Sequence, residues 1–280
     1  MLSRYYGTQA RFLNTGNSMK QFFKSTIRPI LNKCGIDLVR YQPRPTKTSP
    51  FPPDFDEFTK KIYESVTGYT MTGYEKIHAL VESVKYIAKN KIDGAMVECG
   101  VWRGGSVMAM SWILDSLGDR NRDIYLYDTF SGMSKPTEID RSYNGESAQE
   151  EHARKAISEN ASDWCACSME EVQRNVSLTG YPPEKFHFIK GKVQDTIPGT
   201  MPEKIALLRL DTDWYESTKH ELIHLFPRIV PHGVIIIDDY GHWQGAKKAV
   251  DEFIEQNHLC ILLQRINYSG RIAVKTPRTT

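Results

Sequence analysis

The sequence lacks the features expected of a disulfide-stabilised or membrane-spanning protein. Its five cysteines are scattered, no two of them form a CxxC pair, and no apolar secretory segment leads the chain. These absences argue against a disulfide scaffold and against a cysteine zinc site. The formal net charge is only +2 over 280 residues, which gives no reason to expect nucleic acid or an anionic membrane as a partner. We therefore expect a reduced, cytoplasmic setting and no membrane span.

Acidic residues are nearly absent from residues 1–53, where Asp37 is the single acid among nine lysines and arginines. This composition is typical of a mitochondrial transit peptide, but also of an N-terminal extension that does not join a core. We favour the second interpretation, with a proline-rich linker at its end and one domain over residues 54–280. Met19 also reads as a natural start.

After the linker, short apolar runs alternate with segments of helical periodicity. The strand-like runs are AMVECG, IYLYDTF, FHFIKG, IALLRLD, VIIIDD, LLQRI and RIAVK. Helical segments precede or separate them at residues 74–90, 106–118, 168–180, 217–230 and 245–257. This alternation predicts an α/β fold with a doubly wound, mostly parallel sheet that helices cover on both faces. Ligands of such sheets bind at the carboxyl ends of the strands.

The first strand ends in the glycine-rich stretch VECGVWRGGS. Gly100 and Gly104 allow a tight turn and the close approach of a ligand, and Ser106 begins a helix. The dinucleotide pattern G-x-G-x-x-G is incomplete, because Trp102 stands at its second glycine, so a pyrophosphate against this turn is disfavoured. The spacing E-x-G-x-x-x-G-x-S, which begins at Glu98, is similar to the first motif of S-adenosylmethionine-dependent O-methyltransferases. The alternative is a turn without a ligand.

The second strand ends in YLYDTFSGM, which places Asp128 23 positions after Gly105. An acid near this interval accepts hydrogen bonds from ribose hydroxyls in adenosine-binding sheets. NAD enzymes and S-adenosylmethionine enzymes share the feature, so Asp128 favours an adenosine ligand without choosing between them. Taken alone, an acid at a strand end is more often a helix cap.

Two further strands end in pairs of aspartates, Asp211 with Asp213 and Asp238 with Asp239. Clustered carboxylates at neighbouring strand ends are costly unless a cation compensates them. Oxygen ligands suit a hard divalent ion, and Mg²⁺ is the best match. Methyl transfer to a hydroxyl benefits from such an ion, whereas hydride transfer does not require one. The alternative is that these aspartates only cap a helix and a turn.

Six motifs together resemble the macrocin O-methyltransferase family, whose members methylate sugar hydroxyls on macrolide and aminocoumarin antibiotics. They run in order from Thr70 to Phe253: TMTGYEKI, VECGVWRGGS, LYDTFSGM, GKVQDTIP, LLRLDTDWYEST and IIIDDYGHWQGAKKAVDEF. The resemblance implies a Rossmann-like class I methyltransferase fold, S-adenosylmethionine, Mg²⁺ and a small-molecule glycoside or saccharide as the acceptor. We also expect a homo-oligomer.

The resemblance also implies roles for individual residues. Asp211, Asp238 and Asp239 match the metal ligands, and Asp213 matches the general base. Cofactor contacts are implied at Thr70, Met71, Glu98, Gly100, Gly104, Ser106, Asp128, Thr129, Val193 and Asp211. Beyond the last aspartate, Tyr240 and Trp243 could equally form a platform for a sugar ring or pack the loop.

Residues 220–224 spell HELIH, which matches the zinc-protease pattern H-E-x-x-H. This match makes a zinc hydrolase built on His220, Glu221 and His224 a rival hypothesis. No recognisable third zinc ligand follows the motif, which argues against it. A second rival is a non-catalytic protein that keeps only an adenosine pocket. The metal in the purified protein separates the first rival from a methyltransferase, and detectable methyl transfer separates the second.

Overall fold

The computed structural model of the chain describes residues 25, 27–35, 50–158 and 161–277. The chain divides into two compact units, Met1–Pro50 and Phe51–Thr280. In the first unit, the described part contains a short helix, α2 (Arg28–Lys33). Most of the predicted basic extension lies outside the described residues, and its interpretation stays a prediction.

The second unit is built around a seven-stranded sheet with the strand order β5-β2-β1-β6-β7-β9-β8. Neighbours among the first five strands in this order pair in parallel, and β9 runs antiparallel to both β7 and β8. The predicted mostly parallel sheet is therefore confirmed. The strands are β1 (Ala95–Cys99), β2 (Ile124–Asp128), β5 (Phe186–Lys190), β6 (Ile205–Leu210), β7 (Ile229–Ile237), β8 (Gln264–Arg265) and β9 (Arg271–Val274).

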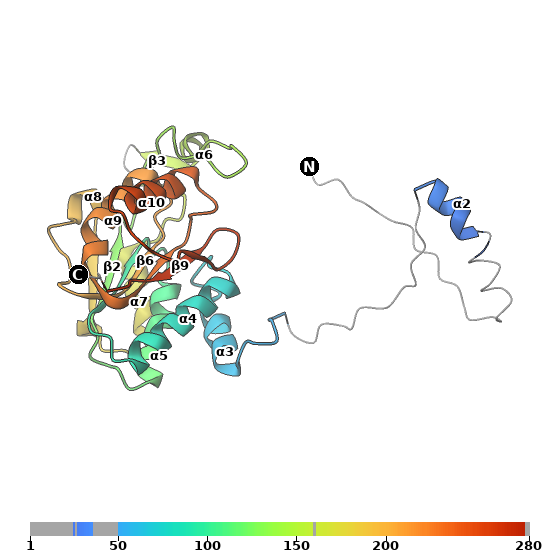
Figure 1. Cartoon of the computed structure of the whole chain (residues 1–280). Helices are drawn as coiled ribbons and strands as arrows, with labels where there is room; N and C mark the ends of the chain where they lie inside the picture. Colours follow the sequence, from blue (N-terminus) through green and yellow to red (C-terminus); the bar gives the residue numbers. More distant parts are fainter. Residues whose placement is uncertain (1–24, 26, 36–49, 159–160, 278–280) are drawn as a thin grey trace. The chain divides into compact units, whose positions relative to one another are not determined.

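Helices cover both faces of this sheet (Figure 1). One layer contains α3 (Glu57–Val66), α4 (Tyr74–Lys89), α5 (Gly105–Ser116) and α7 (Met169–Ser177). The other contains α8 (Val193–Thr196), α9 (Tyr215–Leu225) and α10 (Gln244–Gln256). Successive strand residues point to opposite faces, so Met96 belongs to the first hydrophobic core and Val97 to the second. Both cores are apolar because both faces of the sheet are buried.

The helix predicted over residues 217–230 is too long at its C-terminal end. The α-helix α9 ends at Leu225, a 3₁₀ turn spans Phe226–Arg228, and Ile229 begins β7. Pro227 explains the error, because proline has no amide hydrogen and its ring clashes with the preceding helical turn. The two residues that follow this turn therefore extend the strand instead of the helix.

A segment between β2 and α7 adds small elements that the sequence pattern did not predict. It contains α6 (Ala148–Lys155) and a two-stranded ladder of β3 (Ala156–Ser158) and β4 (Ala161–Ser162). Backbone bonds tie it to the start of α10, where the amide of Gln244 donates to the carbonyl of Arg141 at 2.8 Å. A further 3₁₀ turn, η2 (Pro183–Lys185), leads into β5. Within the described ranges, no helix combines the length and the apolar character needed to cross a membrane.

Candidate active site

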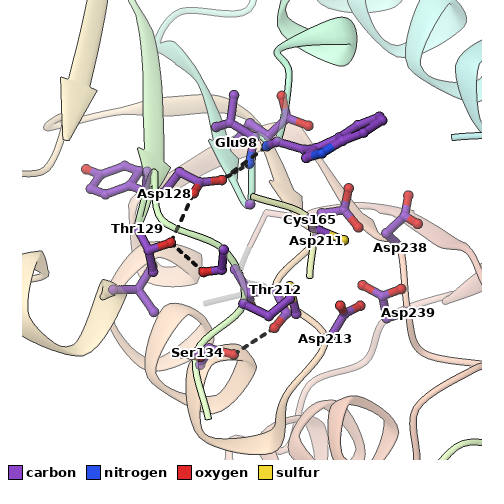
Figure 2. Close-up of a pocket in the computed structure, with 18 of the residues that line it drawn as sticks. Glu98, Asp128, Thr129, Ser134, Cys165, Asp211, Thr212, Asp213, Asp238 and Asp239 are labelled. Carbon is purple, nitrogen blue, oxygen red and sulfur yellow. Dashed lines mark hydrogen bonds between the residues drawn. The ribbon is translucent and has the colours of Figure 1, made fainter. Parts of the chain in front are cut away.

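An open pocket with about 1070 Å³ of space lies at the carboxyl ends of the parallel strands (Figure 2). The predicted site residues come from six separate segments of the chain, and the fold brings all but one of them to this pocket. Gly104 is the exception. Those that line it are Thr70, Met71, Glu98, Gly100, Ser106, Asp128, Thr129, Val193, Asp211, Asp213, Asp238 and Asp239.

The two glycines of the turn after β1 allow neighbouring segments to approach the main chain closely. At Gly104, φ is +88° and an added Cβ would meet Val172 and Val176 of α7, so this glycine lets α7 pack closely against the turn. At Gly100, φ is +84° and an added Cβ would lie 1.9 Å from the carbonyl oxygen of Asp211. The loops after β1 and β6 therefore meet at a distance that only glycine allows.

Asp128 is fixed by backbone amides. One oxygen accepts from the amides of Val101 at 2.7 Å and Trp102 at 3.1 Å, and the other accepts from the amide of Phe130 at 2.8 Å. Burial raises the pKa of Asp128 although these three amides oppose the rise. Asp128 therefore ties the glycine-rich loop to the end of β2 and is exposed to the pocket beside it.

A buried arginine, Arg209, links the carboxylates from inside the sheet. Its Nη1 donates to Glu98 at 2.5 Å and to Asp211 at 2.6 Å. Its Nη2 donates to Asp238 at 2.5 Å and to the hydroxyl of Thr72 at 3.0 Å. Because Glu98 and Arg209 face each other across β1 and β6, the register of the sheet itself positions this group.

The carboxyl groups that Arg209 contacts differ in the direction of their pKa shifts. Burial raises the pKa of Glu98 to about 8, even though the charge of Arg209 opposes the rise. Burial also raises the pKa of Asp211, again against Arg209. For Asp238 the balance reverses: burial favours a higher pKa, but the charges of Arg209 and Lys76 outweigh it and lower the pKa.

Three of the four aspartates lie close enough together to bind one metal ion. Asp211, Asp213 and Asp239 each offer a carboxylate oxygen, and these three oxygens lie within 4.8 Å of one another. Burial raises the pKa of Asp213 to about 7. Burial also raises the pKa of Asp239 well above its usual value, and the negative charge of Asp213 adds to this rise. Among the residues that the structure describes, Asp239 Oδ2 has no hydrogen-bond partner. A buried acceptor without a partner, between two other carboxylates, fits a hard divalent cation.

Asp238 stands apart from this trio. It lies beside the other aspartates in the pocket, but Arg209 binds one of its oxygens and Lys76 of α4 binds the other. The sequence pattern did not single out either cation. A charged residue inside the apolar run IALLRLD was a signal for Arg209, whereas Lys76 comes from a helix 162 residues away and had none.

A sequence profile of the family described as macrocin-O-methyltransferase (TylF) matches residues 45–273 of this chain. The chain belongs to the macrocin O-methyltransferase family. It is accordingly an O-methyltransferase that depends on S-adenosylmethionine, and its sheet is that of the class I methyltransferases. This removes the non-catalytic alternative.

Relatives within the macrocin O-methyltransferase family are similar over most of the domain. Demethyldecarbamoylnovobiocin O-methyltransferase of Streptomyces niveus is 34% identical over 185 residues, which are 66% of this chain and 67% of that protein. Mycinamicin III 3''-O-methyltransferase of Micromonospora griseorubida is 30% identical over 202 residues, 72% of this chain and 76% of that protein. The solved structure of the O-methyltransferase NovP superposes with a TM-score of 0.65 at 30% identity, over 75% of this chain and 83% of NovP.

The HELIH motif belongs to the packing of this macrocin O-methyltransferase. Glu221 is fully buried, and its carboxylate accepts from the hydroxyl of Thr212 at 3.0 and 3.1 Å. The ring of His220 bonds instead to the carbonyl of Ile197 at 2.9 Å. Among the described residues, the groups of side chains able to share a metal ion do not include these histidines. The structure therefore gives the zinc hydrolase hypothesis no support.

Both aromatic residues after Asp239 pack the loop. The hydroxyl of Tyr240 donates to Asp251 at 2.6 Å, and Arg271 lies over its ring at 4.8 Å. Trp243 contacts Trp214 and Trp164 edge to face, with ring centroids 5.0 and 6.2 Å apart. The three tryptophans fix the segment between β2 and α7 against the helices α9 and α10. The packing interpretation is the one that these contacts favour.

Proposed function

We propose that this methyltransferase moves the methyl group of S-adenosylmethionine to a hydroxyl of a sugar or of a glycosylated small molecule, with Mg²⁺ as a second cofactor. The names of its relatives support the acceptor class, since they include demethyldecarbamoylnovobiocin, a dimethoxy-rhamnosyl tetracenomycin C and mycinamicin III. The single observation that carries the mechanism is the meeting of an adenosine-type strand end and a carboxylate trio in one pocket.

The β1 and β2 side of the pocket suits the cationic cofactor. S-adenosylmethionine carries an ammonium and a sulfonium group, so buried carboxylates are natural partners for it. Glu98 Oε2 has no hydrogen-bond partner among the described residues. Glu98 would therefore bind a charged group of the cofactor, and Asp128 would bind its ribose. The residues beside them that would also contact the cofactor are Gly100, Ser106, Thr129 and Val193. Thr70 and Met71 precede α4 and would cover it, and Met71 is 66% exposed.

The β6 and β7 side suits the acceptor and the metal ion. In our proposal Asp211, Asp238 and Asp239 hold Mg²⁺, which supplies positive charge that makes the acceptor hydroxyl more acidic. Asp213 takes the proton from that hydroxyl as the methyl group is transferred. A free aspartate, with a pKa of about 3.9, is a weak base for a hydroxyl, and the bound ion would close that gap by making the hydroxyl more acidic.

The experiment is methyl transfer from labelled S-adenosylmethionine to a panel of glycosides, each paired with its own aglycone. We expect methylated glycosides and unmodified aglycones, with activity lost in EDTA and restored by Mg²⁺. Asp115→Asn, on α5 away from the aspartates, is the matched control and should retain activity. Methylation of aglycones alone would contradict the acceptor class, and full turnover in excess EDTA would contradict the metal requirement. A cytoplasmic location and self-association remain part of the proposal, and sedimentation would test the latter.

A further inference from the structure

Lys76 occupies an unusual place for a lysine. It lies in the first turn of α4, where the positive end of the helix dipole disfavours a cation. Its side chain is only 11% exposed, and its stem runs along the turn at Gly270, where an added Cβ would lie 3.4 Å from Lys76 Cγ and Cε. Its ammonium group donates to Asp238 Oδ2. Attraction to the carboxylates must therefore outweigh both burial and the dipole.

The two cations on Asp238 differ in how firmly they are held. Arg209 is fully buried within the sheet and has four partners, so it cannot move without opening the core. Lys76 reaches Asp238 from α4 through a flexible four-carbon stem, and among the described residues Asp238 is the hydrogen-bond partner of its ammonium group. If a carboxylate oxygen of Asp238 is to bind a metal ion, Lys76 is the partner that can leave.

We propose that Lys76 is a built-in counter-cation of Asp238 that competes with the divalent metal ion for this carboxylate, and so weakens metal binding. This inference rests on the proposed function, because it requires Asp238 to be a metal ligand. It explains why Asp238 stands outside the trio of Asp211, Asp213 and Asp239. With the ammonium on Asp238, an ion entering between Asp211, Asp213 and Asp239 must break the Lys76 contact to gain its further ligand.

The competition has a clear thermodynamic sign. When a competitor binds only the metal-free site, the apparent metal affinity is the intrinsic affinity multiplied by the fraction of time for which the carboxylate is free of the competitor. Removal of the Lys76 charge should therefore tighten metal binding, by about tenfold for a ligand that the ammonium occupies about nine-tenths of the time. A lysine that merely orients Asp238 predicts the opposite, since its removal would loosen the ligand.

The test measures metal affinity directly on the full chain, freed of metal and without an acceptor. Mn²⁺ serves as the probe, with its dissociation constant taken from electron paramagnetic resonance, and Mg²⁺ is then titrated in competition. The variants are Lys76→Met and Lys76→Gln, which remove the charge with and without an apolar replacement, and Lys76→Arg, which keeps it. Lys89→Met removes an exposed charge from the far end of the same helix and is the control.

We expect Lys76→Met and Lys76→Gln to bind Mn²⁺ about tenfold more tightly, with Lys76→Arg and Lys89→Met unchanged. Unaltered or weaker binding in both charge-removing variants would overturn the inference. Circular dichroism melting of each variant shows whether the fold is kept, and Lys76→Gln retains a donor for Asp238 if Lys76→Met does not fold. Asp239→Asn separates the two levels of the proposal. If it leaves Mn²⁺ binding intact, the metal site itself is wrong. If it weakens binding while the Lys76 variants change nothing, only the competition is wrong.

Discussion

The two sides of the pocket stabilise their carboxylates by different means. At the end of β2, Asp128 receives three backbone amides, which are part of the fold and cannot be exchanged for other partners. At the ends of β6 and β7, the aspartates rely on the side chains of Arg209 and Lys76, and one buried oxygen of Asp239 has no partner among the described residues. Asp128 is therefore fully satisfied as folded, whereas the aspartate side still has negative charge to compensate.

At the end of β2 the fold itself supplies the hydrogen-bond partners of the carboxylate, whereas at the ends of β6 and β7 a ligand has to supply part of the compensating charge. Backbone amides bring no net charge, so the β2 side can accept a cofactor without reorganising. On the β6 and β7 side, burial and the neighbouring negative charges raise the pKa values of Asp211 and Asp239, and the two cations only partly balance these charges.

The largest effect is expected from Arg209→Met. The substitution leaves Glu98, Asp211 and Asp238 without their shared buried cation, and we expect a loss of about 3–5 kcal/mol in the free energy of unfolding. Urea denaturation measures it. Arg120→Met is the control, because its ion pair with Asp115 is half exposed and should contribute less than about 1 kcal/mol. Equal stability of Arg209→Met and the wild type would show that the carboxylates do not depend on this arginine.

The aspartate side should split into two kinds of variant. Asp213→Asn removes a base, so we expect turnover to fall about a hundredfold to a thousandfold with the same Mg²⁺ concentration dependence. Asp211→Asn and Asp239→Asn each remove a ligand, so added Mg²⁺ should partly restore their activity. Steady-state kinetics over a range of Mg²⁺ concentrations distinguishes the two. If Asp213→Asn shifts the Mg²⁺ dependence and Asp238→Asn does not, Asp213 is a ligand and the roles must be exchanged.

The β2 side is tested by Asp128→Ala, which removes an acceptor of three backbone amides. We expect the affinity for S-adenosylhomocysteine to fall by about 1.5–3 kcal/mol, while Mn²⁺ affinity is unchanged. Calorimetry gives both quantities. Asp123→Ala, before the opposite end of the same strand, is the matched control and should leave both affinities as they are. A parallel loss of Mn²⁺ binding in Asp128→Ala would mean that the two sides are not independent.

The smallest effect concerns pH in the absence of metal. Because Glu98 and Asp213 have pKa values raised to about 8 and about 7, the folded protein keeps protons that the unfolded chain releases above about pH 4. Unfolding then releases protons, so stability should fall as pH rises from about 5 to 8. Thermal unfolding in EDTA measures the slope, and Mg²⁺ should reduce it. A flat profile in EDTA would show that these carboxylates are already ionised.

Much of the fold and the place of the site could be predicted from the sequence. Runs such as IALLRLD and VIIIDD are apolar throughout because both faces of their strands are buried, and this property identifies a parallel sheet without its partners. The aspartates gather in one pocket because parallel strands end at the same edge. The family then followed from motifs in order along the chain.

What could not be predicted depends on contacts between distant segments. The role of Arg209 requires the register that sets Glu98 opposite it, and the role of Lys76 requires the position of α4 over the end of β7. The segment with α6, β3 and β4 has too little apolar periodicity to be read locally. Three tryptophans, only one of them within it, fix it in place.

Gly100 limits how this enzyme can be redesigned. The loop after β1 touches the carbonyl of Asp211 so closely that a methyl group would not fit between them. The spacing between the two sides of the pocket is thus a property of the main chain, and side-chain substitutions have little leverage over it. Any redesign of the proposed acceptor side would therefore have to work around a fixed distance between the ends of β1 and β6.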